Sequence, residues 1–434
     1  MNYVINNQLL RKFLSIIFFL LLYRIGTYIP LPGVNIQVLY NLIQDQSQGV
    51  IGMFNVLTGG AISRMSIFSL NIMPFITASI IIQIFIISSK DISDLLKNGE
   101  KGKTRMSQYT KYLSFLLALF QGYIISYSME SQHISYNGIN LLQTTGIIFR
   151  IVNVLTLTTG TVIVIWFSEK ISEKGVSNGT SLIIFTGIVS GLLPSIFQLL
   201  EMLKTNILSF QFLLLPFIFL LFIIYTIVFV ENSLRKVSIF FPKKQVRNKL
   251  FVNKVNFLPI KINVSGLMPS IFANSLLLFP ISLLSNNSST NYLSNFFISY
   301  LSHGKPLFII LQSILIFFFS FFYSGVTFNT LEVSNNLRKS GAIITGIRPG
   351  KQTSDYLYFI LMRITVIAAL YIVFICSIPE LIFLHLKLPL YLGGTSLLII
   401  TLVVLDLISY IQSYCTTMGY STLMQNFSIM TRKQ

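Results

Sequence analysis

The chain has 434 residues, of which 53% are hydrophobic and 10% are charged, and its mean hydropathy is +0.74. This composition excludes a water-soluble globular protein and predicts a polytopic membrane protein. The formal net charge of +18 suits either nucleic acid or an anionic membrane surface, so its placement along the chain must decide its meaning. Cys376 and Cys415 lie in or beside apolar segments without metal-ligand spacing. We expect packing residues there, and neither a disulfide nor a metal site.

Ten apolar segments are each long enough to cross about 30 Å of hydrocarbon. The predicted spans are 10–29, 66–88, 110–128, 149–168, 181–200, 206–230, 263–284, 306–328, 357–377 and 392–412. The first span is long and carries Arg24-Ile25-Gly26-Thr27 where a signal peptide would have a small-residue cleavage site. We therefore expect this first span to be retained as a membrane helix.

The basic residues are distributed unevenly between the two sides of the predicted membrane topology. Of the 31 lysines and arginines, 24 fall in the termini and in alternate connections, whereas 4 fall in the remaining connections. Basic residues concentrate on the cytoplasmic side of membrane proteins, so both termini are predicted to lie on that side. The loss of one span would scramble the alternation, and the charge distribution therefore supports the number of spans.

The ten spans divide into five in residues 1–200 and five in residues 201–434. Two such halves have opposite orientations in the membrane, so a structural repeat between them must be inverted. The second span of each half carries a proline just inside its start, Pro74 and Pro269, which is typical of a central pathway between repeats. The predicted fold is all-α, with ten transmembrane helices as two pseudo-symmetric inverted halves around a central pore.

The stretch 52–65 is apolar and rich in small residues but too short to span a bilayer. It leads into a predicted helix from Ser66 to Ser88 that Asn71 and Pro74 break near its start. A re-entrant segment before a proline-broken helix is typical of a chain that lines a cavity. A packed helix with an ordinary proline kink is the alternative interpretation.

Catalytic and ion-coupling motifs are sparse in the sequence. Asp406 is the one well-embedded acid within the predicted spans, and the chain carries no HExxH, GxSxG or P-loop motif. Coupled transporters usually need intramembrane ionisable groups, and Asp406 is also explained as a helix-packing residue. We therefore expect no enzymatic activity and no cofactor.

Two connections, 231–262 and 331–356, carry 12 of the 31 lysines and arginines. Part of this charge sets topology or contacts anionic lipid. Arg348, however, lies between a glycine and a Pro-Gly pair, so it sits on a stiff turn that can present its guanidinium to phosphates or carboxylates. This favours a large acidic partner, such as ribosomal RNA or a motor protein.

Eight stretches, in order along the chain, resemble the SecY family of protein-translocation channel subunits over nearly the full length. They are YRIGTYIPLPG (23–33), GGAISRMSIFSLNIMPFITASIIIQ (59–83), GKTRMSQYTKYLSFLLALFQ (102–121), TGTVIVIWFSEKISEKGVSNGTSLIIFTGIVSGL (159–192), VFVENSLRK (228–236), LPIKINVSGLMPSIFANSLLLFP (258–280), KSGAIITGIRPGKQT (339–353) and LYLGGTSLLII (390–400).

The resemblance implies a clam-shell of two five-helix halves around an hourglass pore that is closed by a plug at about 52–65. The family's pore-ring positions fall on Ile72, Ile76, Ile184, Ile188, Ile271 and Ile399. The plug positions fall on Phe54, Leu57, Gly59, Gly60, Ala61 and Arg64. A ring of branched apolar side chains loses its water when empty, so ions do not leak, yet it moulds around a passing chain.

The family's lateral gate lies between the second, third, seventh and eighth spans. Its candidates here are the polar residues Thr77, Gln121, Asn274 and Ser275. Interhelical hydrogen bonds of about 0.6 kcal/mol each would hold such a gate closed without locking it, although the same residues would also serve a static bundle. The resemblance further implies a docking surface for a motor or ribosome at Lys243, Lys244, Arg247, Arg348 and Lys351.

The resemblance implies as partners a small SecE-type subunit, a SecG-type subunit, a SecA-type motor or the ribosome, signal-bearing precursors, anionic lipids and a YidC/Alb3-type insertase. Heavy use of Ile, Phe, Asn and Lys and the short N-terminal tail favour a plastid-encoded homologue in the thylakoid membrane. The bacterial plasma membrane is the alternative location. A secondary transporter with inverted repeats and an insertase without a through-pore are the alternative functions.

Overall fold

The computed structural model of the protein describes residues 2–35, 59–61, 63–88, 100–131, 135–136, 139–140, 142, 146–175, 177–205, 210–240, 256–284, 305–386 and 393–431. Each of the ten predicted spans coincides with a long helix in this part of the chain. These helices are α1 (Asn2–Gly26), α4 (Met73–Ser88), α6 (Glu100–Ser131), α7 (Ile147–Glu173), α8 (Gly179–Lys204), α9 (Phe210–Glu231), α10 (Met268–Leu284), α12 (Pro306–Thr327), α14 (Lys351–Leu386) and α15 (Gly394–Thr431).

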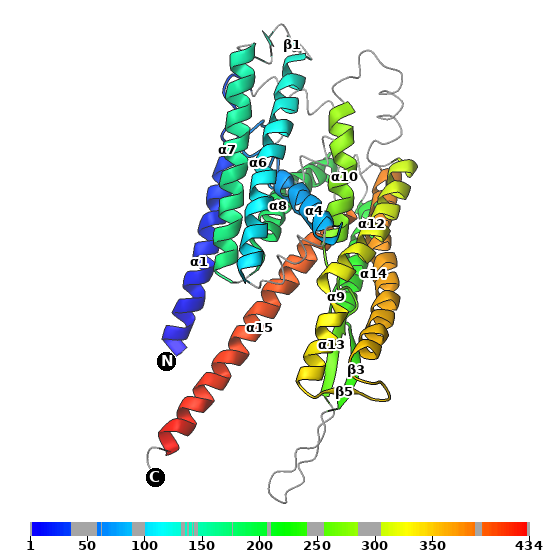
Figure 1. Cartoon of the computed structure of the whole chain (residues 1–434). Coiled ribbons are helices and arrows are strands. Elements are labelled where there is room, and N and C mark those ends of the chain that lie inside the picture. The colour runs from blue at the N-terminus through cyan, green and yellow to red at the C-terminus, as the bar shows by residue number, and fades with distance from the viewer. Residues whose placement is uncertain are drawn as a thin grey trace, which may run out of the picture.

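The helices are arranged in two groups (Figure 1). Helices α1, α6 and α7 stand together in one group, and α9, α12 and α14 form the other, with α4, α8, α10 and the beginning of α15 between them. The beginning of α1 and the end of α15 lie at the same end of the molecule, as an even number of spans requires. By length and hydropathy, the part of the chain that is described contains five helices that could each cross a membrane, in α7, α8, α12, α14 and α15.

The second span begins later than the hydropathy predicts. Helix α4 starts at Met73, and Asn71, just before it, has a φ of 50°. Pro74 therefore lies in the first turn, where its missing N–H is not needed, and does not break a helix that began at Ser66. The prediction of a broken helix was wrong at this point, because the apolar residues 66–72 form turns that pack against the residues after α1.

Backbone hydrogen bonds hold these turns in place. Leu31 N donates to Met65 O at 2.8 Å, and Ile67 N donates to Ile29 O at 3.0 Å. Pro30 and Ser66 form an isolated antiparallel bridge between the same two segments. The segment after α1 and the segment before α4 are therefore paired like two short strands.

The start of α10 repeats the start of α4. Gly266 has a φ of 63° and precedes Met268-Pro269 by the same spacing at which Asn71 precedes Met73-Pro74. Glycine adopts this left-handed conformation without steric cost, whereas asparagine is one of the few other residues that tolerate it. The same entry geometry at the second helix of each half supports the inverted repeat.

A second repeat links α8 and α15, which begin with the sequences Gly179-Thr-Ser-Leu and Gly394-Thr-Ser-Leu. A Cβ on Gly179 would collide with the carbonyl oxygen of Ser168 in α7, and a Cβ on Gly394 would collide with the carbonyl oxygen of Ile375 in α14. In each half, the last span can therefore begin directly against the backbone of the span before it, because its first residue is a glycine.

The helical fold is confirmed, and the connections add two small sheets that the sequence did not predict. Strands β1 (Ser135–Tyr136) and β2 (Ile139–Asn140) form a hairpin at the end of the molecule away from the termini (Figure 1). At the other end, β3 (Leu234–Phe240), β4 (Asn256–Lys261) and β5 (Ile343–Ile344) form an antiparallel sheet in the order β4-β3-β5. This sheet packs on α14 through Val237, Ile260, Ile344 and Leu357.

A short amphipathic helix, α13 (Thr330–Lys339), connects α12 to this sheet. The Asn329 side chain accepts a hydrogen bond from Glu332 N and caps its first turn. Arg338 and Lys339 lie in its last turn, where positive charge is favourable against the helix dipole.

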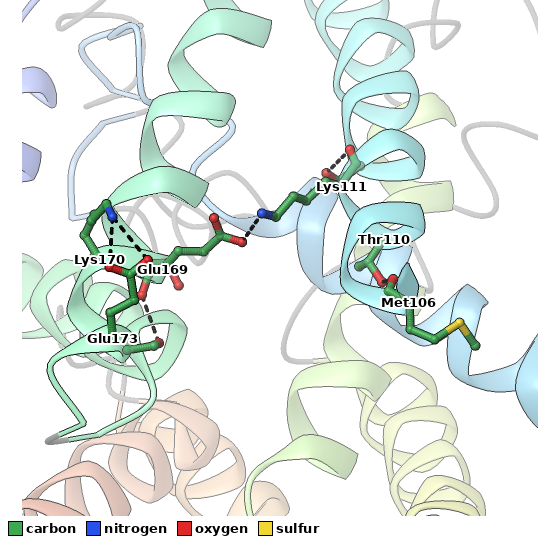
Figure 2. A network of polar contacts seen from close by, with 9 residues as sticks. Met106, Thr110, Lys111, Glu169, Lys170 and Glu173 are labelled. Atoms are coloured by element: carbon green, nitrogen blue, oxygen red, sulfur yellow. Dashed lines mark hydrogen bonds and ion pairs between the residues drawn. The ribbon is translucent and has the colours of Figure 1, made fainter. Parts of the chain in front are cut away.

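Ion pairs fasten α6 to α7 near both ends of the two helices. Figure 2 shows Lys111 of α6 reaching Glu169 of α7 at 2.6 Å, with Glu173 bound by its own neighbour Lys170. At the far end, Arg150 of α7 pairs with Glu130 of α6. The pair α6–α7 therefore behaves as one unit within the first half.

Candidate functional site

The six isoleucines predicted to form a pore ring are all buried and belong to one hydrophobic cluster. Their side chains are at most 9% exposed, and they lie in or directly before α4, α8, α10 and α15: Ile72, Ile76, Ile184, Ile188, Ile271 and Ile399. Helices of both halves therefore contribute to this cluster, which we call the isoleucine ring. The assignment of the ring to a pore stays a prediction.

The internal repeats relate the members of the ring to one another. Ile76 follows Asn71 by five residues, and Ile271 follows Gly266 by five residues. Ile184 and Ile399 likewise each follow, by five residues, the glycine that begins α8 or α15. Equivalent positions of the two halves thus place branched apolar side chains in the same cluster. The repeated Gly-Thr-Ser-Leu motif was a signal for this pairing that is readable in the sequence.

The predicted gate residues do not form one continuous hydrogen-bonded set. The Thr77 hydroxyl donates to the carbonyl oxygens of Met73 and Pro74 within its own helix. Gln121 is half-buried on α6. Ser275 of α10 donates to Ile271 O at 2.9 Å, and its Oγ lies 4.0 Å from Met73 Sδ of α4. Ser275 is thus the predicted gate residue with a polar contact between α4 and α10.

Asn274 contacts α12, the helix of the eighth predicted span. Its Oδ1 accepts a hydrogen bond of 2.8 Å from Nε2 of Gln312 on α12, and both side chains are buried. Asn274 therefore joins two helices of the same half. Its side chain points to a different face of α10 from that of Ser275, because successive residues of a helix lie on different faces. Sequence reasoning missed Gln312, although a glutamine in a span of Ile, Leu and Phe is a visible signal.

A further contact between α4 and α12 was also missed. The Gln83 side chain of α4 lies near the Tyr323 hydroxyl on α12, and its Nε2 donates to Ser79 Oγ within α4 at 3.3 Å. Gln83 and Tyr323 are polar residues on apolar helices of different halves. Together with Ser275 and Met73, they line the interface between α4 and the pair α10–α12.

The structure describes four of the predicted plug residues, Gly59, Gly60, Ala61 and Arg64, whereas Phe54 and Leu57 lie outside the described residues. Gly59 has a φ of 67° and lies against α8, where a Cβ would collide with Ser190 Oγ and lie 2.8 Å from Gly187 O. Gly187 and Ser190 flank Ile188 of the isoleucine ring. The end of the predicted plug segment therefore contacts the helical turn that carries a ring residue.

The sheet brings the two basic connections together. Arg235 and Lys236 lie on β3, and β5 from the second connection pairs with the end of β3. Arg348 is exposed on the turn after β5, and Lys351 is exposed at the beginning of α14. Thr353 Oγ1 donates to Arg348 O at 2.8 Å, and Ser334 Oγ donates to Gly350 O at 2.6 Å, so this turn is held in place as the sequence suggested. Lys243, Lys244 and Arg247 lie outside the described residues.

One expectation about embedded acids was wrong. Glu380 is 4% exposed in α14, beyond the predicted end of that span at residue 377, and it faces Gln312. Helix α14 continues to Leu386 despite Pro379, so the hydropathy window ended too early. Asp406 lies within α15, and its side chain is exposed.

Apolar helices in two inverted halves, with equivalent side chains meeting in one cluster, define the class of inverted-repeat membrane transport proteins. The family profile described as SecY matches residues 66–408. The chain is 43% identical to the protein translocase subunit SecY of Rickettsia typhi over 424 residues, which cover 98% of each chain. It is 39% identical to the Escherichia coli K12 subunit over 97% of this chain and 95% of that relative. The chain belongs to the SecY family.

Solved structures show the same fold. A structure described as that of a protein conducting channel matches with a TM-score of 0.67 and 17% identity, over 92% of this chain and 91% of that one. Sec61 in the canine ribosome-channel complex from the endoplasmic reticulum matches with a TM-score of 0.61 and 17% identity, over 93% of this chain and 92% of that one. Family membership decides against the secondary-transporter alternative.

Proposed function

We propose that this chain is the channel-forming subunit of a protein translocase. It passes unfolded, signal-bearing polypeptides across the membrane and releases hydrophobic segments sideways into lipid. The observation that carries the proposal is the isoleucine ring, because repeat-equivalent residues of both halves converge on it in a chain of the SecY family. The chain itself has a passive role and carries out no catalysis.

The chemistry of the ring suits this function. Branched apolar side chains make no directional bonds, so they can surround a passing polypeptide of any sequence. When the pore is empty, the same side chains exclude water and thereby block ions. The plug segment, about 52–65, would add a second seal next to Ile188.

The sideways exit would lie between α4 and α6 of the first half and α10 and α12 of the second. Thr77, Gln121, Asn274 and Ser275 would line this gate. We add Met73, Gln83 and Tyr323 to it. A hydrophobic signal segment that reaches the opened gate would leave for the lipid because apolar surface is removed from water.

Energy for transport would come from a partner that binds the basic sheet surface. Arg348 on its stabilised turn and Lys351 at the beginning of α14 would dock onto phosphate or carboxylate groups of a ribosome or a SecA-type motor. A SecE-type subunit would clamp the two halves, with a SecG-type subunit, anionic lipids and a YidC/Alb3-type insertase as further partners. The bacterial origin of the relatives favours the bacterial plasma membrane over the thylakoid membrane.

A site-specific crosslink tests the proposal. A photoreactive residue would replace Ile72, and a secretory precursor would be arrested halfway through transport. We expect an adduct that requires both the signal sequence and the motor. Ile364 is a matched control, because it is equally buried but lies in the cluster beneath the sheet. No adduct at position 72, with labelling from position 348, would mean that precursors dock without threading.

A further inference from the structure

The predicted plug segment is held by side chains at the end of α1. Arg24, in the last turn of α1, donates from Nη1 to the carbonyl oxygen of Gly59 at 2.7 Å. Its Nη2 donates to the Tyr28 hydroxyl at 3.1 Å. One guanidinium thus binds a backbone carbonyl of the segment and a phenol of the chain that follows α1. Hydrogen bonds from a charged donor are stronger than those between neutral groups.

A second arginine reaches the same phenol from the plug segment itself. The guanidinium carbon of Arg64 lies 4.0 Å from the centre of the Tyr28 ring, and that of Arg24 lies 4.9 Å from it. Both distances are within the range of cation–π attraction. The Tyr28 ring therefore contacts two guanidinium groups, one from α1 and one from residue 64. These two attractive contacts hold the positive charges near each other despite their mutual repulsion.

The backbone contacts and the side-chain contacts differ in what they fix. The pairing of residues 29–31 with residues 65–67 ties down the C-terminal end of the segment. The bond from Arg24 ties down residue 59, at the other end of the described part. Gly59 and Gly60 have φ values of 67° and 84°, so the chain between the two attachments turns through conformations that glycine adopts freely.

We propose that Arg24, Tyr28 and Arg64 form a latch that keeps Gly59 against α8 and the channel closed, while the pairing at 65–67 is the hinge of the plug segment. Opening breaks the bond between Arg24 and Gly59 and the contact between Arg64 and Tyr28, and the segment swings about the hinge without unfolding it. The three residues position the segment and do not contact a translocating chain in the closed state. This inference rests on the proposed function of the segment as a plug.

Four variants, in the full chain assembled with its partner subunits, test the latch. Arg24→Gln removes the cation, Tyr28→Leu removes the ring, and Tyr28→Phe keeps the ring but removes the hydroxyl. The Tyr28 side chain is 55% exposed, so its replacement leaves packing intact. Arg363→Gln is the matched control, because Arg363 makes the same kind of contact, 4.0 Å from the Phe359 ring, on α14.

Two measurements are made on each variant: amide hydrogen exchange of residues 59–64 and ion conductance of the reconstituted complex. We expect exchange in Arg24→Gln and Tyr28→Leu to rise about tenfold, since the loss of one charge-assisted hydrogen bond corresponds to roughly a factor of ten. Tyr28→Phe should rise less and Arg363→Gln not at all. Residues 65–67 should keep their exchange rates in all variants, and conductance should rise in parallel with exchange.

The outcomes separate the latch from the plug. Faster exchange with unchanged conductance would show that the contacts hold the segment in place but do not close the channel. This result would overturn both the latch and the plug assignment. Unchanged exchange at 59–64 in both Arg24→Gln and Tyr28→Leu would overturn the latch and leave the proposed channel function intact. Faster exchange at 65–67 would overturn the hinge.

Discussion

Helices within one half are held differently from α4 and α10, which meet across the two halves. Inside each half, Gly179 and Gly394 bring one helix against the backbone of another. The buried pair Asn274–Gln312 and the half-buried ion pair Glu130–Arg150 add directional bonds. Between α4 and α10, the contact consists of branched apolar side chains and the 4.0 Å approach of Ser275 Oγ to Met73 Sδ.

This difference teaches which parts of the molecule can move. A glycine against a carbonyl has no room to slide, since interiors are close-packed and a small shift produces a collision. Apolar side chains that meet without directional bonds can separate and be replaced by lipid or by a polypeptide. We therefore interpret the halves as rigid bodies and the interface between α4 and α10 as the part that opens.

The largest effect is expected from Gly394→Val. The new side chain would collide with the carbonyl oxygen of Ile375, and overpacking of this kind costs about 3 kcal/mol. The free energy of unfolding in detergent or bicelles measures the loss. Gly325→Ala on α12 is the control and should be close to neutral, because a Cβ there would meet nothing within 4 Å. A Gly394→Val variant as stable as the control would contradict the rigid-half interpretation.

Ile271→Asn should have the next largest effect. A buried side-chain amide without a hydrogen-bond partner lowers the free energy of unfolding by about 2 kcal/mol. The polar group would also let water into the isoleucine ring. We expect a severalfold higher ion conductance in the reconstituted complex and weaker discrimination between signal sequences. The control, Ile364→Asn, should lose similar stability without a leak. Unchanged conductance in Ile271→Asn and in Ile72→Asn would refute the pore-ring assignment.

A smaller effect is expected from Asn274→Leu. It leaves the buried Gln312 amide without its partner on α10, at a cost of about 1 kcal/mol. The double variant Asn274→Leu, Gln312→Leu should regain part of this loss, and a double-mutant cycle of unfolding free energies measures the coupling. Additive losses would mean that the pair does not hold α10 to α12.

The smallest effect is expected from Ser275→Ala. Its hydroxyl already donates to Ile271 O within α10, and the contact with Met73 is long, so the change in unfolding free energy should stay within about 0.5 kcal/mol. The free energy of unfolding, measured as for Asn274→Leu, checks this expectation. A loss as large as that of Asn274→Leu would show that the interface between halves is as firmly held as the halves themselves.

The hydropathy pattern predicted the number and order of the helices, because a bilayer demands long apolar segments whatever their partners. It placed the start of α4 wrongly, since residues 66–72 are apolar but are shaped by their pairing with residues 29–31. The sheet was not predicted, because the pairing of β3 with β5 joins residues about a hundred positions apart. Charge at Arg235 and Lys236 made β3 resemble a loop.

The candidate site could also be predicted from the sequence only in part. Burial of the six isoleucines follows from apolar spans and the family resemblance, whereas the partner of a polar residue depends on how helices rotate against each other. The gate assignment of Asn274, for example, did not reveal that its side chain bonds Gln312 of its own half. The contact of Arg24 with Gly59 joins two segments whose proximity no local pattern reveals.

The most direct test of an opening interface between rigid halves is a reversible crosslink. Met73→Cys and Ser275→Cys, in a chain whose Cys376 and Cys415 are replaced by alanine, would be joined by a short reducible thiol reagent. The matched control joins Asn274→Cys to Gln312→Cys within one half. We predict that the first crosslink stops precursor transport until it is reduced, whereas the control leaves transport unchanged. Transport at the uncrosslinked rate through a chain joined at 73 and 275 would contradict the account.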